Sequence, residues 1–323
     1  MKPLISIVIL NYNGEEYIDI SLKSILNLNY ENLEVILVDN NSTDESLNII
    51  NLISKGKIKI IKNKINFGSN KGRQIGIENS NGKYVLLLDG DIEITDENII
   101  PKLLELHISD KNIAFTQLPI IDVNKDRTIY YGIYFSIYDF VKNLKPLTMN
   151  EINRMPKTLQ IGSPTGACLF FERSTWDKIG GFDLSQPYHM DEFDLGPRAW
   201  IFGFKNILYS KSYLIHHGVK HSITKDVIIK RFSYLFSGHA RGLIKNYNTK
   251  NLILRFPIFF LYHFLKSILY SFKNRDLRIF FAYIKSLYFF ILSLKELKNE
   301  RQKIQSKRKI KEDLFLNIKP PII

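Results

Sequence analysis

The stretch Tyr84-Val85-Leu86-Leu87-Leu88-Asp89-Gly90-Asp91 decides the fold. Five apolar or aromatic residues are followed at once by two carboxylates. A strand that is apolar on both faces is typical of a parallel sheet covered by helices on each side. Ligands of such sheets bind beyond the carboxyl ends of the strands. The sequence therefore predicts a binding site at the end of this strand.

The two acids of this stretch, Asp89 and Asp91, flank a glycine. They would repel each other unless a cation lay between them, and a hard divalent ion that also binds a diphosphate suits that arrangement. A polar turn after a strand is the alternative, because Asp and Gly are common in turns. So short a motif is a hypothesis that its neighbours must support.

Length and composition bound the class of protein. A chain of 323 residues can hold one large domain, or a domain and an appendage. The single cysteine, Cys168, excludes a disulfide framework and a cysteine-based zinc site, which fits a reducing compartment. Met1-Lys2-Pro3 runs directly into a strand-like segment, so we expect no secretion signal and a cytoplasmic location.

The charge is unevenly distributed along the chain. Residues 1–240 carry as many acidic as basic side chains, and the whole net charge of +13 lies in residues 241–323. This change in composition indicates a boundary. We expect one domain over residues 1–240, with an internal division near residue 117. A basic tail would follow.

Strand-like and helix-like segments alternate over residues 1–91, with short connections. Ser42-Thr43-Asp44-Glu45 fits a capping box at the start of one helix. The alternation predicts an α/β fold with a doubly wound, mostly parallel sheet and helices on both faces. The expected strands are Leu4–Leu10, Leu33–Val38, Ile58–Ile61 and Tyr84–Leu88, and the expected helices lie near Tyr17–Leu28, Leu47–Ile53 and Arg73–Glu78.

The pattern is weaker beyond residue 91. Residues 118–160 read as an irregular insertion on the substrate side, in which Ile129–Ile137 could be a strand or a hairpin arm. Ser174-Thr175-Trp176-Asp177 fits a second capping box, and Gly180-Gly181 can end its helix. The other expected elements are a helix near Ile99–His107 and strands at Ile113–Gln117, Ala167–Phe171 and Ile207–Ser210.

A nucleotide is the expected ligand of such a sheet edge. The chain has no G-x-G-x-x-G after its first strand and no G-x-x-x-x-G-K-[ST], which argues against a Rossmann dehydrogenase and a P-loop enzyme. The polar side chains at the strand ends, Asn11, Asn13 and Asp39, would then have to hold the base and ribose.

Two further clusters are candidates for chemistry. Asp191, Glu192 and Asp194 lie at the expected start of a helix, where acids can simply favour the positive end of the helix dipole, or where one can act as a base. His216, His217 and His221 lie within six positions, although a histidine is more often a surface or core residue than a ligand.

Taken in order, these segments resemble the family 2 glycosyltransferases, inverting nucleotide-sugar enzymes of GT-A fold that include rhamnosyltransferases. The resemblance covers about residues 4–222, and more weakly the C-terminal tail. It implies that residues 1–240 are a catalytic domain, with a nucleotide-sugar half up to about residue 117 and an acceptor half over 118–240. It rests on Ile7–Asn13, Val38–Ser46, Asn66-Phe67-Gly68 with Gly72-Arg73-Gln74, Asp89-Gly90-Asp91, Gly180-Gly181-Phe182-Asp183, and Asp191–Leu195 with Arg198. Gln74 replaces the usual Asn of the family.

The resemblance implies a role for each candidate. Asn11, Asn13, Asp39, Arg73 and Asp89 would bind the nucleotide sugar, with Asp39 at the base or ribose and Arg73 near the diphosphate. The metal, Mg²⁺ or Mn²⁺, would be bound by Asp91 and Asp89, and by His216, for which the adjacent histidine could exchange.

One departure from the family concerns the catalytic base. The family usually has Glu-Asp, whereas this chain has Asp191-Glu192. By position Glu192 is the base and Asp191 the second candidate. The implied reaction is a single inverting displacement that moves a hexosyl or deoxyhexosyl group to a hydroxyl of a lipid-linked or cell-surface glycan.

Two other functions share this architecture. A sugar-phosphate nucleotidyltransferase would attack phosphorus and would favour a G-x-G-T-R-type loop after the first strand, where Asn11-Tyr12-Asn13-Gly14 stands instead. A non-catalytic nucleotide-sugar-binding protein would keep the sheet but lose the acids of Asp89-Gly90-Asp91 or of Asp191-Glu192. Both pairs are present.

The tail differs in composition from the rest. Residues 251–294 contain 13 Phe and Tyr with basic residues interleaved. No apolar run in this span reaches 18 residues without a charged residue, so we do not expect a helix that spans a membrane. Helices of this kind lie in the interface of an anionic membrane, which predicts a peripheral location on its inner face. A helical pair packed on the catalytic domain and a partner-binding surface are the alternatives. Glu300–Lys311 would be a solvated helix or a flexible end, and no base-stacking motif points to nucleic acid.

Overall fold

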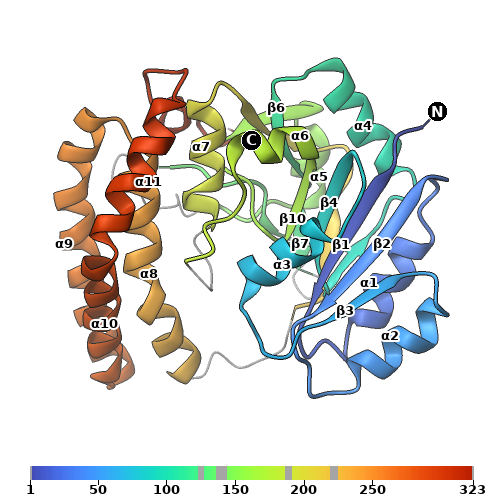
Figure 1. Ribbon diagram of the computed structural model, residues 1–323, viewed down its shortest axis with the longest axis horizontal. Helices are drawn as coiled ribbons and strands as arrows, with labels where there is room; N and C mark the ends of the chain where they lie inside the picture. The colour runs from blue at the N-terminus through green and yellow to red at the C-terminus, as the bar shows by residue number, and fades with distance from the viewer. Residues whose placement is uncertain (1, 123–126, 136–143, 186–190, 219–224, 322–323) are drawn as a thin grey trace.

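The computed structural model describes residues 2–122, 127–135, 144–185, 191–218 and 225–321. A large twisted sheet with helices on both faces forms one part, and a layer of long helices stands beside it (Figure 1). This confirms the predicted mixed α/β class with a helical C-terminal region. The strands of the large sheet are β1 (Ile5–Asn11), β2 (Leu33–Asp39), β3 (Lys59–Lys62), β4 (Tyr84–Asp89), β6 (Ile113–Gln117), β9 (Thr158–Ile161), β10 (Cys168–Glu172) and β11 (Lys205–Tyr209).

The strand order is β3-β2-β1-β4-β10-β6-β11-β9. The first four strands are parallel to one another, whereas β10 runs antiparallel between β4 and β6. In the register of the parallel strands, Asn11 lies opposite Asp39 and Leu10 lies opposite Asp89. The polar residues that end β1, β2 and β4 therefore meet at one edge of the sheet.

Alternate residues of each central strand enter two different cores. Ile7 and Ile9 of β1 pack toward one group of helices and Val8 packs toward the other. Both faces are buried, which explains why β1 and β4 are apolar along their whole length. The helices on the first face are α1 (Ile18–Leu26), α2 (Ser46–Ser54) and α4 (Ile99–Ser109), and those on the second are α3 (Ser69–Glu78), α6 (Arg173–Ile179) and α7 (Leu195–Ile201).

A second, smaller sheet was not predicted, apart from the possible hairpin arm near Ile129. Its strands are short, and three of them belong to segments with no clear alternation of apolar and polar residues. The tail-end residues 136 and 137 of that expected arm lie outside the described residues. The sheet consists of β5 (Ile92–Ile94), β12 (Leu214–His216), β7 (Ile120–Asp122) and β8 (Arg127–Tyr130), in that order.

Both expected capping boxes are wrong. α2 begins at Ser46, and the hydroxyl of Ser42 donates to the Asp39 carboxylate instead of capping a helix. α6 begins at Arg173 without a side-chain cap. A capping box does start α5 (Met149–Arg154), where Thr148 and Glu151 bond reciprocally. The first expected box fails because Asp39 takes the Ser42 hydroxyl, and the second fails because α6 begins one residue before Ser174.

The C-terminal helices are α8 (Lys225–Asn246), α9 (Thr249–Asn274), α10 (Arg278–Leu292) and α11 (Leu294–Ser306). The expected boundary between residues 240 and 241 falls inside α8. Residues 307–310 follow α11 against the catalytic domain, where the backbone N–H of Lys309 donates to the carbonyl of Ile201 at 2.8 Å. The short helix η2 (Leu314–Leu316) buries Phe315 completely. The end of the chain is therefore a packed part of the fold.

Candidate functional site

A cavity of about 320 Å³ lies at the edge where β1 and β4 end. The residues that line it come from strand ends, from α3, and from the 3₁₀ helix η1 (Asp191–Phe193). Of the site residues expected from the sequence, all but Asp39 line this cavity. The polar lining residues are Asn11, Asn13, Ser69, Arg73, Asp89, Asp91, Thr165, Asp191, Glu192 and His216, together with Tyr12, Tyr17 and Tyr130.

Arg73 is the central cation of the cavity. Its Nη2 donates to both carboxylate oxygens of Asp89, at 2.8 and 3.0 Å, and its Nη1 lies 3.5 Å from Asp191 Oδ2. Burial opposes its charge, but Asp89 and Asp191 outweigh that effect and raise the pKa of the guanidinium. Gly166 permits this arrangement, since a Cβ there would lie 2.3 Å from Arg73 Nη1. Arg73 is thus held rigidly with its charge facing the cavity.

Glu192 is the acid whose environment differs most from water. Burial raises the pKa of its carboxyl to about 8, and the neighbouring charge of Asp191 adds to the rise. Its Oε2 has no hydrogen-bond partner among the described residues. Asp191 instead contacts Arg73. A carboxyl with a pKa near 8 and a free oxygen is suited to accept a proton near neutral pH.

Asp91 and His216 form the pair that could hold a metal. Asp91 Oδ2 lies 3.4 Å from His216 Nε2, because β12 pairs with β5 and places His216 opposite Ile92. Burial raises the pKa of the Asp91 carboxyl, His216 partly offsets the rise, and Asp89 adds to it. The described residues contain no group of three or more such ligands. Two protein ligands still fit Mg²⁺ or Mn²⁺, because diphosphate oxygens and water commonly complete such a site.

Two expected ligands are engaged elsewhere. Both oxygens of Asp89 accept from Arg73, so this carboxylate supports the guanidinium. His217 Nε2 lies 2.8 Å from Glu93 Oε2, and its ring stacks on Tyr17 with centroids 5.8 Å apart. Only His216 of the two adjacent histidines lines the cavity. The geometry favours His216 over His217.

Asp39 organises the loop beside the cavity. Its Oδ1 accepts from Asn11 Nδ2 at 2.9 Å and its Oδ2 accepts from the backbone N–H of Ser42 at 3.0 Å. Asn13 adopts a left-handed φ of 49° and its Oδ1 accepts from the Thr43 backbone. Asp39 is 1% exposed. Its hydrogen bonds therefore fix the segment of Asn11 and Asn13 that faces the cavity.

Sequence reasoning missed several lining residues. Thr165 and Gly166 precede β10, and the buried Oγ1 of Thr165 has no partner among the described residues. Tyr130 is the last residue of β8 and also lines the cavity. The run Ser163-Pro164-Thr165-Gly166-Ala167, small residues just before a strand, was the available signal.

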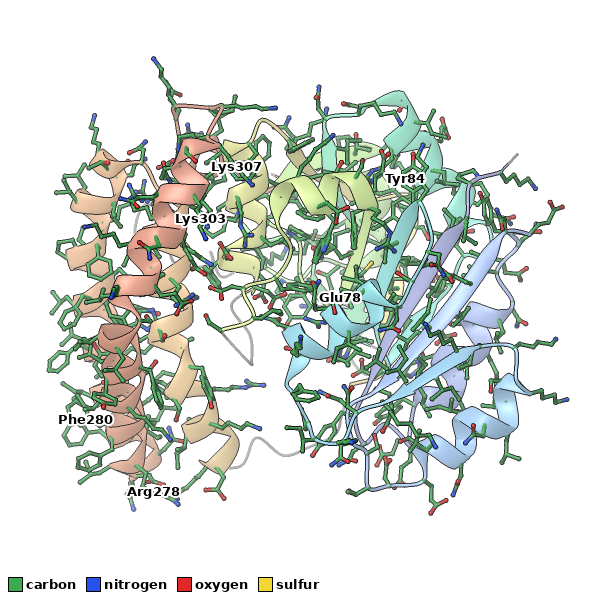
Figure 2. The ribbon with its side chains drawn as sticks, in the orientation of Figure 1. Glu78, Tyr84, Arg278, Phe280, Lys303 and Lys307 are labelled. Atoms are coloured by element: carbon green, nitrogen blue, oxygen red, sulfur yellow. The ribbon has the colours of Figure 1, made fainter. Side chains whose placement is uncertain are left out.

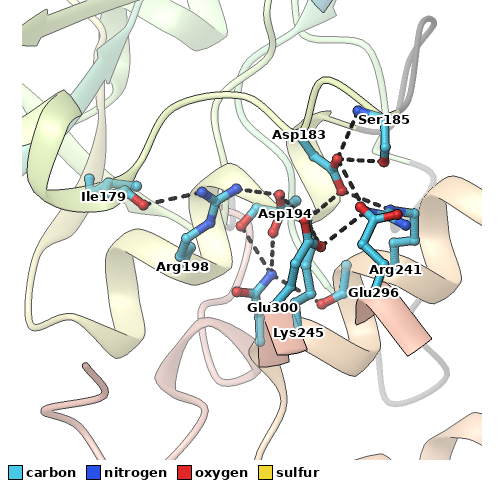
Figure 3. Close-up of polar contacts among 11 residues, drawn as sticks. Ile179, Asp183, Ser185, Asp194, Arg198, Arg241, Lys245, Glu296 and Glu300 are labelled. Atoms are coloured by element: carbon cyan, nitrogen blue, oxygen red, sulfur yellow. Dashed lines mark hydrogen bonds and ion pairs between the residues drawn. The ribbon is translucent and has the colours of Figure 1, made fainter. Parts of the chain in front are cut away.

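A second group of acids, Asp183 and Asp194, contacts basic residues of α8 and Arg198 (Figure 3). Asp183 accepts from Arg241 at 2.8 Å and from Lys245 at 2.6 Å. Lys245 also contacts Asp194 at 2.7 Å, and Asp194 is paired with Arg198. These motif acids attach the catalytic domain to α8.

The comparisons with known proteins identify the family and the fold. The family model described as glycosyl transferase family 2 matches residues 6–180, more than half of the chain. The chain belongs to glycosyl transferase family 2. An uncharacterized glycosyltransferase of Haemophilus influenzae is 39% identical over 153 residues, which cover 46% of each chain. The chain thus matches about half the length of that curated relative.

Two further similarities concern a named enzyme and the fold. The Escherichia coli enzyme UDP-Glc:alpha-D-GlcNAc-diphosphoundecaprenol beta-1,3-glucosyltransferase WfaP is 36% identical over 88 residues, covering 27% of this chain and 35% of that enzyme. The crystal structure of GalNAc-T7 with UDP, GalNAc and Mn²⁺ superposes with a TM-score of 0.66 at 16% identity, covering 98% of this chain and 56% of that one. At this identity the structural match shows the fold alone.

Proposed function

We propose that this family 2 glycosyltransferase is a metal-dependent inverting enzyme that moves a hexosyl or deoxyhexosyl group, rhamnosyl included, from a nucleotide diphosphate sugar to a hydroxyl. The observation that carries the proposal is the placement of Glu192 in one cavity with Arg73 and the Asp91–His216 pair. A base, a cation for the leaving group and a metal-binding pair then serve one reaction. Family membership argues against the alternative of a sugar-phosphate nucleotidyltransferase.

The nucleotide end of the donor would lie along the loop of Asn11 and Asn13. These residues line the cavity on the side of β1, and Asp39 holds them there. Arg73, from α3, would face the diphosphate. In the GalNAc-T7 structure the same fold binds UDP and Mn²⁺, which supports a nucleotide-sugar donor here.

The carboxylate of Glu192 would remove the proton of the acceptor hydroxyl as its oxygen attacks the anomeric carbon. Attack on the face opposite the diphosphate inverts that centre, and one base suffices because no covalent enzyme intermediate forms. Asp191, held by Arg73, would orient the acceptor or keep Glu192 basic through its own charge.

Negative charge collects on the departing diphosphate. Arg73 already carries a guanidinium at the required edge of the cavity, so it would stabilise this charge as it develops. A divalent cation bound by Asp91 and His216 would supply further Lewis-acid stabilisation of the same group. Asp89 would act by holding Arg73 in place.

The acceptor is proposed from the name of one relative, and the location is proposed from the C-terminal helices. The printed name of the E. coli relative describes transfer to a diphosphoundecaprenol-linked sugar, which favours a lipid-linked or cell-surface glycan as acceptor. We place the chain at the cytoplasmic face of the membrane, attached through its C-terminal helices.

A panel of nucleotide sugars incubated with the protein and Mn²⁺ tests the proposal. Release of nucleoside diphosphate reports turnover, and proton NMR of the product reports the anomeric configuration. We expect release with one donor class, dependent on the metal, and a product of inverted configuration. Retention of configuration, or full turnover in EDTA, would contradict the mechanism.

A further inference from the structure

The burial pattern of α9 is the reverse of that in a surface helix of a water-soluble protein. Its buried residues, Phe259, His263, Ser267 and Ser271, recur every four positions and include three polar side chains. A helix on the surface of a protein in water normally buries its apolar stripe and exposes its polar face. The large apolar and aromatic residues that α9 exposes are Ile253, Leu254, Ile258, Phe260, Leu261, Leu265, Leu269, Tyr270 and Phe272.

α10 extends the same apolar face. Most of the large apolar side chains exposed among the described residues lie between Ile253 and Leu294. The ring of Phe280 lies on the outer side of this helical layer, away from the sheet (Figure 2). α11 shows the ordinary pattern, with Leu297 buried and its lysines exposed. So large an apolar face, rimmed by charge, marks an interaction surface.

A pocket of about 390 Å³ lies between α8 and α9, at the edge of this face. It contains three cations and no acid. Lys266 Nζ lies 5.4 and 5.7 Å from the ring centroids of Tyr262 and Tyr270. Within the part of the chain that the structure describes, Arg231, Lys266 and Lys273 form no ion pair. The lining residues are Ile228, Arg231, Phe232, Leu235, Lys266, Tyr270, Lys273 and Asn274.

These features call for a ligand that is both anionic and apolar. Uncompensated cations favour a phosphate group, and the apolar walls continue into the exposed face of α9. A lipid with a phosphate headgroup has both parts. We propose that the α9–α10 face docks on an anionic lipid bilayer and that the α8–α9 pocket binds the phosphate headgroup of one lipid.

This inference deepens the membrane location proposed above and does not depend on sugar transfer. α9 is the one helix among the described residues that is long and apolar enough to cross a membrane. Only 17% of its most apolar 18-residue stretch is buried. Its inner face nevertheless packs in the protein. Phe259 lies against Phe236 of α8 with centroids 5.4 Å apart, and His263 Nε2 lies 3.1 Å from His239 Nδ1. Docking keeps these contacts, whereas crossing would separate α9 from α8.

Flotation of the full chain with lipid vesicles tests the proposal. We expect binding to vesicles of phosphatidylcholine with phosphatidylglycerol, little binding to phosphatidylcholine alone, and release by high salt. The variant Arg231→Gln/Lys266→Gln/Lys273→Gln should bind at least about tenfold more weakly, because each cation near an anionic surface contributes to affinity. No binding to anionic vesicles would overturn the docking surface.

A matched control removes equal charge from α11 and from Lys307, the residue that follows it. Lys298→Gln/Lys303→Gln/Lys307→Gln should lose less than about threefold; an equal loss would show general charge attraction and overturn the headgroup pocket. The three lysines are exposed, and Figure 2 shows Lys303 and Lys307 along this helix. Nucleotide-sugar binding should be unchanged in both triple variants, so vesicle binding and the proposed enzyme function fail or stand separately.

Substitutions on the apolar face separate the lipid from other occupants. Leu261→Gln/Leu265→Gln/Leu269→Gln changes exposed residues, so it should keep the melting temperature and lose vesicle binding. The alternative is a contact between two copies of the chain. In that case wild type would not bind vesicles, and light scattering would show a dimer for wild type and a monomer for this variant. Retention in the membrane pellet after alkaline extraction would indicate a spanning helix and overturn docking.

Discussion

Two clusters of buried acids differ in how their charge is balanced. Asp183 and Asp194 contact Lys245, with Arg241 and Arg198 beside them. Among the residues that the structure describes, Asp191 and Glu192 share the cation Arg73 with Asp89.

The imbalance moves the pKa values in opposite directions. Burial raises the pKa of Asp183, but Lys245 and Arg241 outweigh it and hold that pKa well below its usual range. Burial and Asp191 raise the pKa of Glu192 to about 8. The balance of nearby charge therefore decides the outcome: the cations around Asp183 keep it charged, whereas Glu192 holds its proton to a higher pH.

The largest expected effect breaks the neutralised cluster. Lys245→Met leaves Asp183 and Asp194 buried with too few cations, and removing one partner of a buried pair costs about 3–5 kcal/mol. Thermal unfolding should show a clear fall in melting temperature. Lys298→Met, at an exposed lysine of α11, is the control and should change little. An unchanged melting temperature for Lys245→Met would show that the cluster does not hold α8. For the same reason, a chain truncated at Gly242 should not yield a stable soluble domain.

The next effect concerns the metal pair. Asp91→Asn keeps the shape of the side chain and removes the charge that would hold the cation. Donor turnover should fall at least about a hundredfold, as when an electrostatic stabiliser of a leaving group is lost. Asp177→Asn, at an exposed acid of α6, should retain full turnover. Equal turnover of Asp91→Asn and wild type would remove the metal role from Asp91.

A third test separates the two acids of η1. Glu192→Gln should bind nucleotide sugar but transfer it about a hundredfold more slowly, the usual contribution of a general base. Asp191→Asn should lose less rate and show more of its effect on acceptor affinity, because Arg73 engages this carboxylate. Turnover and donor binding are measured for each variant. The reverse ranking would make Asp191 the base, and two mild effects would leave both acids as a helix cap.

The smallest effects concern pH. Glu192 must lose its proton to act as a base, so kcat/KM should rise with pH up to about 8 and be roughly a tenth of its plateau one unit below that pKa. Stability should move the other way. The folded state keeps this proton to a higher pH than the unfolded chain, so the raised pKa weakens folding as pH rises from 4.5 toward about 8.

Glu192→Gln removes that penalty. Its free energy of unfolding above pH 8 should exceed that of wild type, and the difference should vanish at acid pH. A denaturant titration at both pH values checks this. A variant less stable than wild type at high pH would contradict the raised pKa of Glu192.

The sequence alone determined the α/β class, the central strands and the sheet edge at which the cavity lies. These features depend on patterns within a few residues, such as the apolar run before Asp89 and the polar ends of β1 and β2. It also indicated most of the polar side chains that line the cavity, although Asp39 lies beside it, and Asp89 and His217 contact Arg73 and Glu93.

The tertiary structure alone decided which of these side chains act together. Asp91 and His216 are far apart in the chain and meet because β5 pairs with β12, a short sheet without a clear periodic signal. Glu192 and Asp194 are two positions apart, yet one faces the cavity and the other faces Lys245 of α8. Charge balance depends on contacts between distant segments, so composition could not predict it. The basic tail supplies two of the cations that neutralise the acids of the catalytic domain, Arg241 and Lys245, and this is why domain and tail form one packed structure.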